Sequence, residues 1–237
     1  MIEQNHNPAE EISLFEAMYS ARAMRWLKPD PVPAHLIARI LEAATQAPNA
    51  GNRQNWLFVV VRDPEQRRRI GAIYRRVSLW VLQRYQHQGK PANQSQAEYD
   101  RMMKGGTHLY DHMADAPVLL LPCLRIKPFD LPAELPEEVR SAMTAAAPWT
   151  AGASIYPAMQ NIILACRALG LGTLPTTNHT IAEDEIKAVL NLPPEVRTFA
   201  LMPIGYPERN FGPLTRRPVS EVAILDYYDT PFSTTSW

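Results

Sequence analysis

The sequence has few cysteines, no charge bias and no long apolar run, and each shortage excludes a class of protein. Only Cys123 and Cys166 occur, without metal-ligand spacing, so we expect two buried side chains rather than a disulfide framework or a zinc site. Lys plus Arg and Asp plus Glu both total 24, which argues against a nucleic-acid-binding protein with an overall basic field. The longest apolar runs, Trp56–Val61 and Val118–Leu121, are too short to span a bilayer.

The sequence also lacks a secretory signal and the common motifs of hydrolytic catalysis. Met1–Glu11 is polar and acidic, the wrong character for the start of a signal peptide, so we expect a cytoplasmic protein. No HExxH, GxSxG or P-loop pattern occurs, and we assign neither a catalytic side chain nor a metal ligand. This is compatible with chemistry that is carried by a bound cofactor.

Proline, in contrast, is abundant: 22 of 237 residues, where about 5% is usual. The prolines are spread along the chain, as expected for helix starts, helix ends and extended connections. We find no repeat and no clear linker, so residues 1–237 are treated as one domain, with Pro207–Trp237 as a proline-rich C-terminal arm. Its aromatic residues suit an arm that packs on another surface: Phe211, Tyr227, Tyr228, Phe232 and Trp237.

Hydrophobic periodicity predicts helices that alternate with a few strands, which indicates an α+β or α/β fold. The segment 77–113 is polar and compatible with a helix, with an interruption at Gly105 and Gly106, and 126–150 reads as a loop with a short helix. The predicted helices are 12–20, Pro33–Ala47, 64–75, 155–169 and 183–190, and the predicted strands are Trp56–Arg62, Pro117–Leu124 and Arg197–Tyr206.

Local signals mark several of these boundaries. Asp63 is placed to cap a helix that begins at Pro64, and Gly170 stands where the helix 155–169 should end. Thr180–Glu183 has the pattern of a capping box, and Glu183 with Lys187 forms an i,i+4 pair.

Four segments carry polar or basic residues that are candidates for binding a ligand. Arg22-Ala-Met-Arg25 places two arginines on one face if the segment is a helical turn, although two solvated arginines are also possible. Pro48-Asn-Ala-Gly-Asn-Arg-Gln-Asn-Trp56 is a polar turn between a helix and a strand. Gly170–Thr177 lacks the third glycine of a dinucleotide-binding turn and follows a helix. Thr215-Arg-Arg-Pro218 adds a late basic pair.

In this order and at these separations, the four segments resemble the nitroreductase family of FMN-dependent oxidoreductases. The resemblance covers roughly 12–75 and 115–222. It implies an α+β fold with a mixed β-sheet flanked by helices and a central buried helix. It also implies an intertwined homodimer that exchanges the arm 207–237 and binds FMN at the subunit interface. The segment 77–113 would be a variable lid, with possible lining residues at Trp80, Tyr85, Tyr99, His108 and Tyr110.

The resemblance also implies which residues hold the cofactor. Arg22, with Arg216 and Arg217, would bind the phosphate; Arg25 would lie at the N1/O2 edge of the ring, and 175–177 near N5 and O4. Ala21 and Ala23 stand where family members often have Arg and Ser, and Asn55 replaces a common Pro. The implied cofactor-binding residues are Arg22, Ala23, Arg25, Pro48, Asn49, Ala50, Asn52, Gln54, Pro175, Thr176, Thr177, Arg216 and Arg217.

The resemblance implies that NADH or NADPH reduces the flavin, which then reduces a small nitroaromatic, quinone or similar electron-poor acceptor. Reductive dehalogenation and oxygen-dependent flavin fragmentation are alternatives, although 77–113 has no clear Glu-Tyr-Lys set for reading a zwitterionic substrate. A flavin-binding protein without turnover is a further alternative. A nucleic-acid module built on Arg67–Arg69, Arg75 and Arg76 would require salt-dependent DNA binding, and we expect neither a nucleic-acid nor a membrane partner.

Overall fold

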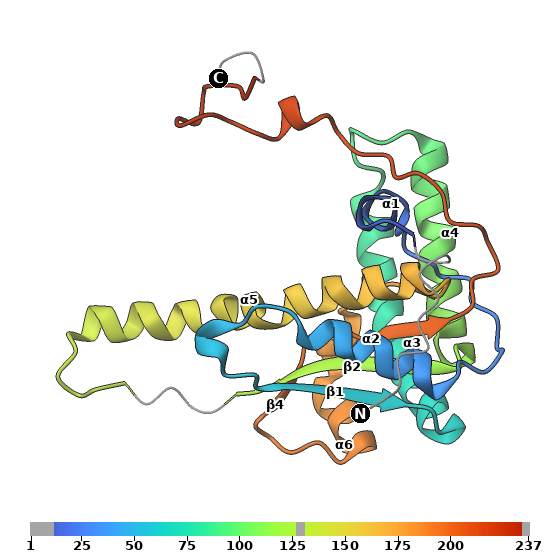
Figure 1. The fold of residues 1–237 in the computed structure, drawn as a ribbon, viewed down its shortest axis with the longest axis horizontal. Helices are drawn as coiled ribbons and strands as arrows, with labels where there is room; N and C mark the ends of the chain where they lie inside the picture. The colour runs from blue at the N-terminus through green and yellow to red at the C-terminus, as the bar shows by residue number, and fades with distance from the viewer. Residues whose placement is uncertain (1–11, 127–130, 234–237) are drawn as a thin grey trace.

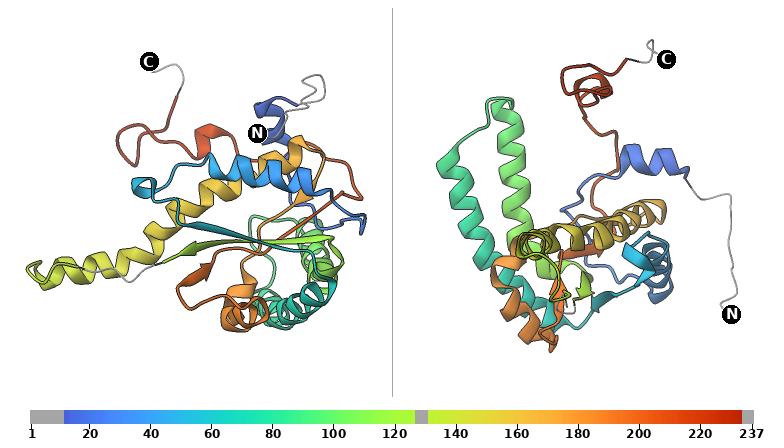
Figure 2. Two further views of the ribbon diagram at one scale, coloured as in Figure 1. Left: turned by 60° about the horizontal axis from the view of Figure 1, so that its bottom comes forward. Right: turned by 90° about the vertical axis from the view of Figure 1, so that its left-hand side faces the viewer.

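One antiparallel sheet lies between two layers of helices in the computed structural model, which describes residues 12–126 and 131–233. Figure 1 shows the chain, and the left view of Figure 2 shows the sheet between its two helical layers. Met1–Glu11 and Trp237 lie outside the described residues. The helices are α1 Leu14–Ser20, α2 Ala34–Thr45, α3 Pro64–Gln88, α4 Gln96–His112, α5 Glu137–Ala168 and α6 Glu183–Leu190. The strands are β1 Trp56–Val61, β2 Val118–Arg125, β3 Gly172–Thr173, β4 Val196–Thr198 and β5 Met202–Gly205.

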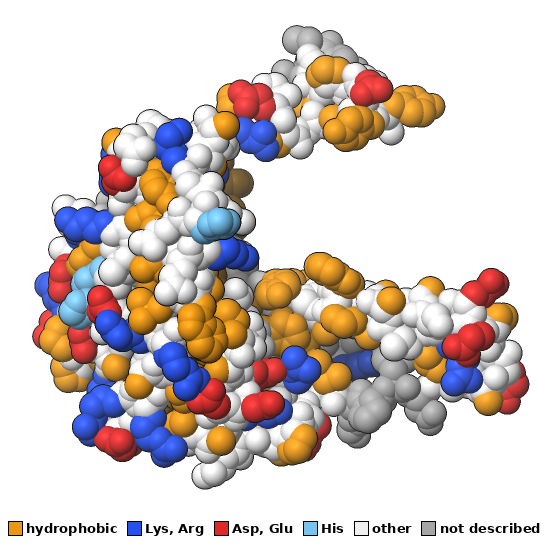
Figure 3. Space-filling model, turned by 180° about the vertical axis from the view of Figure 1, so that it is seen from behind, with side chains coloured by type: hydrophobic (Ala, Val, Ile, Leu, Met, Phe, Trp, Pro, Cys, Tyr) orange, Lys and Arg blue, Asp and Glu red, His pale blue; other side chains and the backbone are white. Residues whose placement is uncertain are grey.

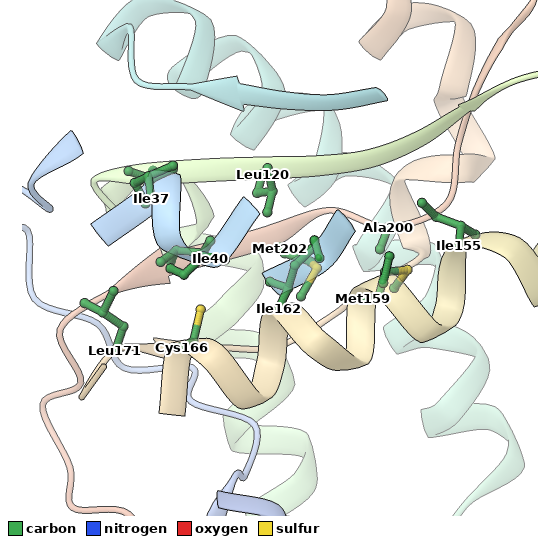
Figure 4. Packing of buried hydrophobic residues seen from close by; sticks show 14 of the residues in the cluster. Ile37, Ile40, Leu120, Ile155, Met159, Ile162, Cys166, Leu171, Ala200 and Met202 are labelled. Atoms are coloured by element: carbon green, nitrogen blue, oxygen red, sulfur yellow. The ribbon is translucent and has the colours of Figure 1, made fainter. Parts of the chain in front are cut away.

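Strand β2 is the centre of the sheet and separates two hydrophobic cores. Its side chains alternate: Leu120 and Leu124 face α2 and α5, whereas Leu119 and Leu121 face α3, α4 and α6. Figure 4 shows the first core, in which Ile155, Ile162 and Cys166 of α5 pack on the sheet. Both cysteines are free and buried, as the sequence predicted.

The sheet is entirely antiparallel among the described residues, so the expectation of a mixed sheet is wrong for this part of the chain. The strand expected at 197–206 is also divided into β4 and β5. Between them Leu201 exchanges two backbone hydrogen bonds with Thr176, at 2.8 and 3.0 Å. The division therefore brings the segment after β3 into the sheet.

Helices α3 and α4 form a projecting hairpin that includes residues 77–112 of the expected lid, as the right view of Figure 2 shows. Asp63 caps α3 as predicted, since its carboxylate accepts from Gln66 N at 2.8 Å. Gly105 and Gly106 do not interrupt α4. A β-carbon on Gly105 would lie only 3.3 Å from Arg25 Cδ, so glycine allows the arginine to approach the helix closely.

Helix α5 is much longer than the sequence indicated, because 137–150 joins the buried helix with Pro148 and Pro157 inside it. Alanines around both prolines favour the helix. The expected capping box at 180–183 is wrong. Thr180 Oγ1 donates to Thr177 O at 2.7 Å, and Ala182 is the N-cap. Lys187 Nζ donates to Pro194 O at 2.9 Å instead of pairing with Glu183.

None of the helices in 12–126 and 131–233 is both long and apolar enough to cross a membrane.

Candidate functional site

The N-terminal arginine motif is extended rather than helical, so the expectation that Arg22 and Arg25 share a helical face is wrong. Met24 N donates to Thr173 O at 3.2 Å, and Lys28 N donates to Tyr206 O at 2.8 Å. These bonds hold 24–28 beside β3 and the end of β5. Arg22 is exposed, whereas Arg25 is partly buried under α4.

Arg22 lies beside the start of the C-terminal arm. A β-carbon on Gly212 would lie 3.7 Å from Arg22 Nη1. Leu214 N donates to Tyr19 O at 3.2 Å, so the arm is fixed next to the residues that precede Arg22. Arg216 and Arg217 follow directly on the exposed arm, and Arg216 Nη1 donates to its neighbour's carbonyl at 2.8 Å.

Arg167 at the end of α5 connects these segments, although sequence reasoning did not select it. Its guanidinium lies 4.3 Å from the centre of the Phe211 ring, and its Nε donates to Ser20 Oγ at 2.8 Å. A weaker contact of 3.4 Å reaches Glu16. Arg167 therefore fixes the arm against the first helix, close to Arg22.

Arg25 is a partly buried cation that forms no ion pair among the described residues. Burial is the main cause that lowers the pKa of its guanidinium, and the nearby Tyr74 and Tyr110 oppose this shift. A cation in such a position acts more strongly on a neighbouring ligand than one in water, because the local dielectric constant is lower.

Thr176 is fixed by its backbone and by its side chain. Besides its two backbone bonds to Leu201, its Oγ1 lies 2.9 Å from the hydroxyl of Tyr74 in α3. Pro175 and Thr177 on either side are exposed. Because Tyr74 also lies near Arg25, the structure brings Arg25 and the segment 175–177 to one region.

The loop 48–54 is a tight turn, as predicted. Asn49 Oδ1 accepts from Gln54 N at 2.9 Å, and Asn52 Oδ1 accepts from Gln54 Nε2 at 3.2 Å. Gly51, Asn52 and Gln54 have positive φ angles of 60°, 50° and 48°. Asn52 and Gln54 remain exposed, with Pro48 and Ala50 beside them on the surface.

This loop is fixed to the middle of α5, away from the arginines. Ala50 N donates to Ser154 Oγ at 3.2 Å, and Trp56 Nε1 donates to Ser154 O at 2.6 Å. Arg167, which marks the region of Arg22, lies thirteen residues further along the helix, or about 20 Å at 1.5 Å per residue. The two groups of predicted residues are therefore not brought together within one chain.

A cleft of about 540 Å³ lies on the α4 side of Arg25. Arg25 is the one implied cofactor-binding residue in its lining, which also includes His108, His112 and Glu208. The His108 ring stacks on Trp26 with ring centres 4.5 Å apart. Burial, followed by the nearby His112, lowers the pKa of His108.

The other possible lid residues have different environments. Tyr110 is buried in the core between α3 and α4, and Tyr99 donates its hydroxyl proton to Tyr85 O at 3.1 Å. Trp80 is exposed on α3. Helix α3 extends to Gln88, beyond the end near residue 75 that the sequence predicted, so Tyr74 and Ser78 were not expected to be neighbours on one helix face.

Comparison with known proteins shows both the family and the fold. The sequence description of the Nitroreductase family matches residues 18–206. The chain is 29% identical over 213 residues to a protein of Thermus thermophilus named NADH dehydrogenase, which covers 88% of this chain and 93% of that protein.

Two solved structures have the same fold. A BluB-like flavoprotein from Clostridium difficile 630 superposes with a TM-score of 0.67 at 23% identity, over 90% of this chain and 99% of that one. Iodotyrosine deiodinase, solved with FMN and 3-iodo-L-tyrosine, superposes with a TM-score of 0.64 at 21% identity, over 92% of this chain and 100% of that one.

The fold is thus an α+β sandwich of the nitroreductase type. Because the family match covers most of the sequence, the chain belongs to the nitroreductase family.

Proposed function

We propose that this protein is an FMN-dependent oxidoreductase. NADH or NADPH reduces the flavin, and a nitroaromatic, quinone or similar electron-poor acceptor is then reduced by two electrons. The names of relatives support this proposal: one is an NADH dehydrogenase, and one related structure contains FMN.

The observation that carries the proposal is Arg25, a partly buried cation without an ion-pair partner among the described residues. A buried charge is costly unless it is compensated. Bound FMN would supply that compensation when reduced, because negative charge then develops at the N1/O2 edge. The exposed Arg22, Arg216 and Arg217 fit a phosphate, so the residues present fit this cofactor.

Each group of residues then has a distinct task. FMN, when bound, supplies reversible two-electron chemistry. Arg22 and the arm arginines bind the phosphate, and Arg167 holds the arm in place. Arg25 stabilises negative charge at one edge of the ring, while the segment 175–177 provides hydrogen-bond donors at the other edge.

The separation of the two groups along α5 supports a homodimer as part of this proposal. The loop 48–54 lies about 20 Å from the end of α5 near Arg22, so in this proposal a second chain supplies it to the FMN held by the first chain. A two-fold symmetric dimer would contain two such FMN sites, because each chain carries both groups of residues.

The first test is the visible absorption spectrum of the protein purified without added flavin, with the cofactor released by heat and identified. We expect a flavin spectrum and released FMN, followed by oxidation of NADH or NADPH when menadione or nitrofurazone is added. A colourless protein that also fails to take up added FMN would contradict the proposal. Bound FMN without turnover would instead indicate a flavin-binding protein that is not a reductase.

Reductive dehalogenation is the second candidate, because iodotyrosine deiodinase shares the fold. Helix α4 does contain a glutamate, a tyrosine and a lysine, at Glu98, Tyr99 and Lys104. However, Glu98 forms a capping box with Ser95, and the Tyr99 hydroxyl binds Tyr85 O. Two of the three groups are therefore occupied within the hairpin.

Release of iodide from 3-iodotyrosine distinguishes the two candidates. With chemically reduced protein under anaerobic conditions, we expect little iodide but rapid reduction of a quinone. Rapid release of iodide with slow quinone reduction would favour the dehalogenase.

A further inference from the structure

A line of buried polar groups lies behind Thr176, between the segment 176–178 and α3. Asn178 Nδ2 donates to Ser78 Oγ at 3.1 Å. Ser78 stands one helical turn after Tyr74 and is near enough to its hydroxyl to lower the pKa of that group. The Tyr74 hydroxyl lies 2.9 Å from Thr176 Oγ1. Tyr74 and Ser78 are both 0% exposed. Four polar side chains therefore lie in one chain, with hydrogen bonds from Asn178 to Ser78 and between Tyr74 and Thr176.

The chemistry of its first member gives this chain a direction. An amide nitrogen can only donate, so Ser78 accepts from Asn178 and can direct its own proton to Tyr74. Tyr74 can then donate to Thr176, which leaves the Thr176 proton free for a ligand. Burial is the main cause that raises the pKa of Tyr74 to about 12, so this phenol keeps its proton at neutral pH.

We propose that Tyr74 is a positioning residue that fixes the Thr176 hydroxyl as a hydrogen-bond donor toward the N5/O4 edge of bound FMN. This inference rests on the proposed function, because it requires that FMN binds beside 175–177. Leaving a buried hydroxyl without a partner is unfavourable, so the packing of α3 against 176–178 maintains the chain.

The fixed donor has a definite effect on the flavin. N5 carries no hydrogen in the oxidised ring and accepts a hydrogen bond, whereas N5 of the reduced ring carries a hydrogen. A donor held at N5 therefore favours the oxidised form. Arg25 has the opposite effect at the other edge, because it favours the negative charge of the reduced form. Tyr74 lies near both Arg25 and Thr176. One side chain is therefore a neighbour of both groups that act on the midpoint potential, in opposite directions.

The experiment is a double-mutant cycle on the protein with bound FMN. The midpoint potential and the dissociation constants of oxidised and reduced FMN are measured for wild type, Tyr74→Phe, Thr176→Val and the double variant. We expect Tyr74→Phe to weaken binding of oxidised FMN at least threefold relative to reduced FMN. For a two-electron couple this equals a rise of about 14 mV. In the Thr176→Val background the same substitution should have no further effect.

Tyr99→Phe is the matched control, because it also removes a tyrosine hydroxyl from the α3–α4 hairpin, at the bond to Tyr85 O. It should leave the potential unchanged. If Tyr74→Phe does not fold, Ser78→Ala breaks the chain one step earlier and should shift the potential in the same direction. An unchanged potential in the folded variant, or an equal shift without the Thr176 hydroxyl, would show that Tyr74 only packs. A wild type that binds no FMN would instead contradict the proposed function itself.

Discussion

Arg22 and Arg25 come from one motif but have different environments, and the roles proposed for them differ accordingly. Arg22 is exposed beside the arm, while Arg25 lies under Gly105 of α4, near Tyr74 and Tyr110. The resemblance to the nitroreductase family implied that both arginines bind the cofactor. The sequence could not predict that the two side chains have different environments. These depend on the backbone hydrogen bond from Met24 N to Thr173 O, which joins residues far apart in the chain.

Arg25→Ala should lower the midpoint potential of bound FMN and slow its reduction by NADH or NADPH. The reason is that the substitution removes the cation that favours the reduced, anionic ring. A loss of about 1.4 kcal/mol corresponds to a fall of about 30 mV for a two-electron couple. Spectroelectrochemical titration and stopped-flow reduction measure both effects.

Arg22→Ala is the control for this prediction. It should weaken binding of FMN, but not of riboflavin, and leave the potential nearly unchanged. An unchanged potential and rate in Arg25→Ala would remove Arg25 from this role.

His179 should make the protein less stable in mild acid. It is fully buried, its Nε2 lies 3.0 Å from Thr198 Oγ1, and burial lowers its pKa to about 4. The unfolded chain, with a pKa near 6.5, binds the proton more readily. The contribution of neutral His179 to the free energy of unfolding is therefore complete above about pH 6.5. It decreases as the pH drops toward 4, by at most about 3 kcal/mol.

Urea unfolding between pH 7.5 and 4.5 measures this effect. His179→Gln retains a donor to Thr198 but does not titrate, so the variant should lose most of the pH dependence. The exposed His35 serves as the matched position, and His35→Gln should keep the wild-type dependence. Equal pH profiles for wild type and His179→Gln would contradict the assignment.

At the scale of helices and strands, local signals predicted positions better than lengths. The strands β1 and β2 and the helices α2 and α6 lie close to their predicted ranges, because each has a clear apolar pattern and a marked end. Helix α5 was underestimated, since Pro148 and Pro157 are usual signals of a helix end. The division between β4 and β5 could not be predicted, because it depends on the pairing of Leu201 with Thr176.

Gly172 allows β3 and the arginine segment 22–28 to approach each other closely. A β-carbon there would lie 2.7 Å from Met24 Cβ and 2.8 Å from Leu27 Cδ2. Gly172→Ala should therefore displace the segment that carries Arg22 and Arg25. We expect a loss of about 1–3 kcal/mol in stability and at least tenfold weaker FMN binding, measured by urea unfolding and fluorescence titration.

The matched control for Gly172 is Gly106→Ala in α4. Its added β-carbon would have the Tyr110 hydroxyl as its nearest neighbour, at 3.3 Å, and alanine is the better helix former. Stability should change little, and FMN affinity should remain close to that of wild type. Wild-type affinity in Gly172→Ala would show that the close approach does not position the arginines.

At the scale of the whole molecule, the single chain is open rather than closed on itself. The arm and the first half of α5 extend away from the sandwich, and the surface between them is hollowed (Figures 1 and 3). Trp149 on α5 is 83% exposed, and Tyr228 on the arm is 86% exposed. Several apolar residues of α1 are also exposed. Large exposed apolar patches of this kind mark interaction surfaces.

The protein should therefore behave as a homodimer, with a mass near twice the 26.8 kDa of one chain in light scattering after size-exclusion chromatography. Trp149→Asp should shift the equilibrium toward the monomer, because it places a charge where an apolar surface is expected to be covered. FMN affinity should fall at the same time, since the loop 48–54 would no longer reach the partner's arginines. Ile181→Asp introduces the same charge at another exposed apolar residue and should leave both mass and affinity unchanged. A monomeric wild type that binds one FMN per chain tightly would contradict the shared site, and the loop would then have no role in binding the cofactor.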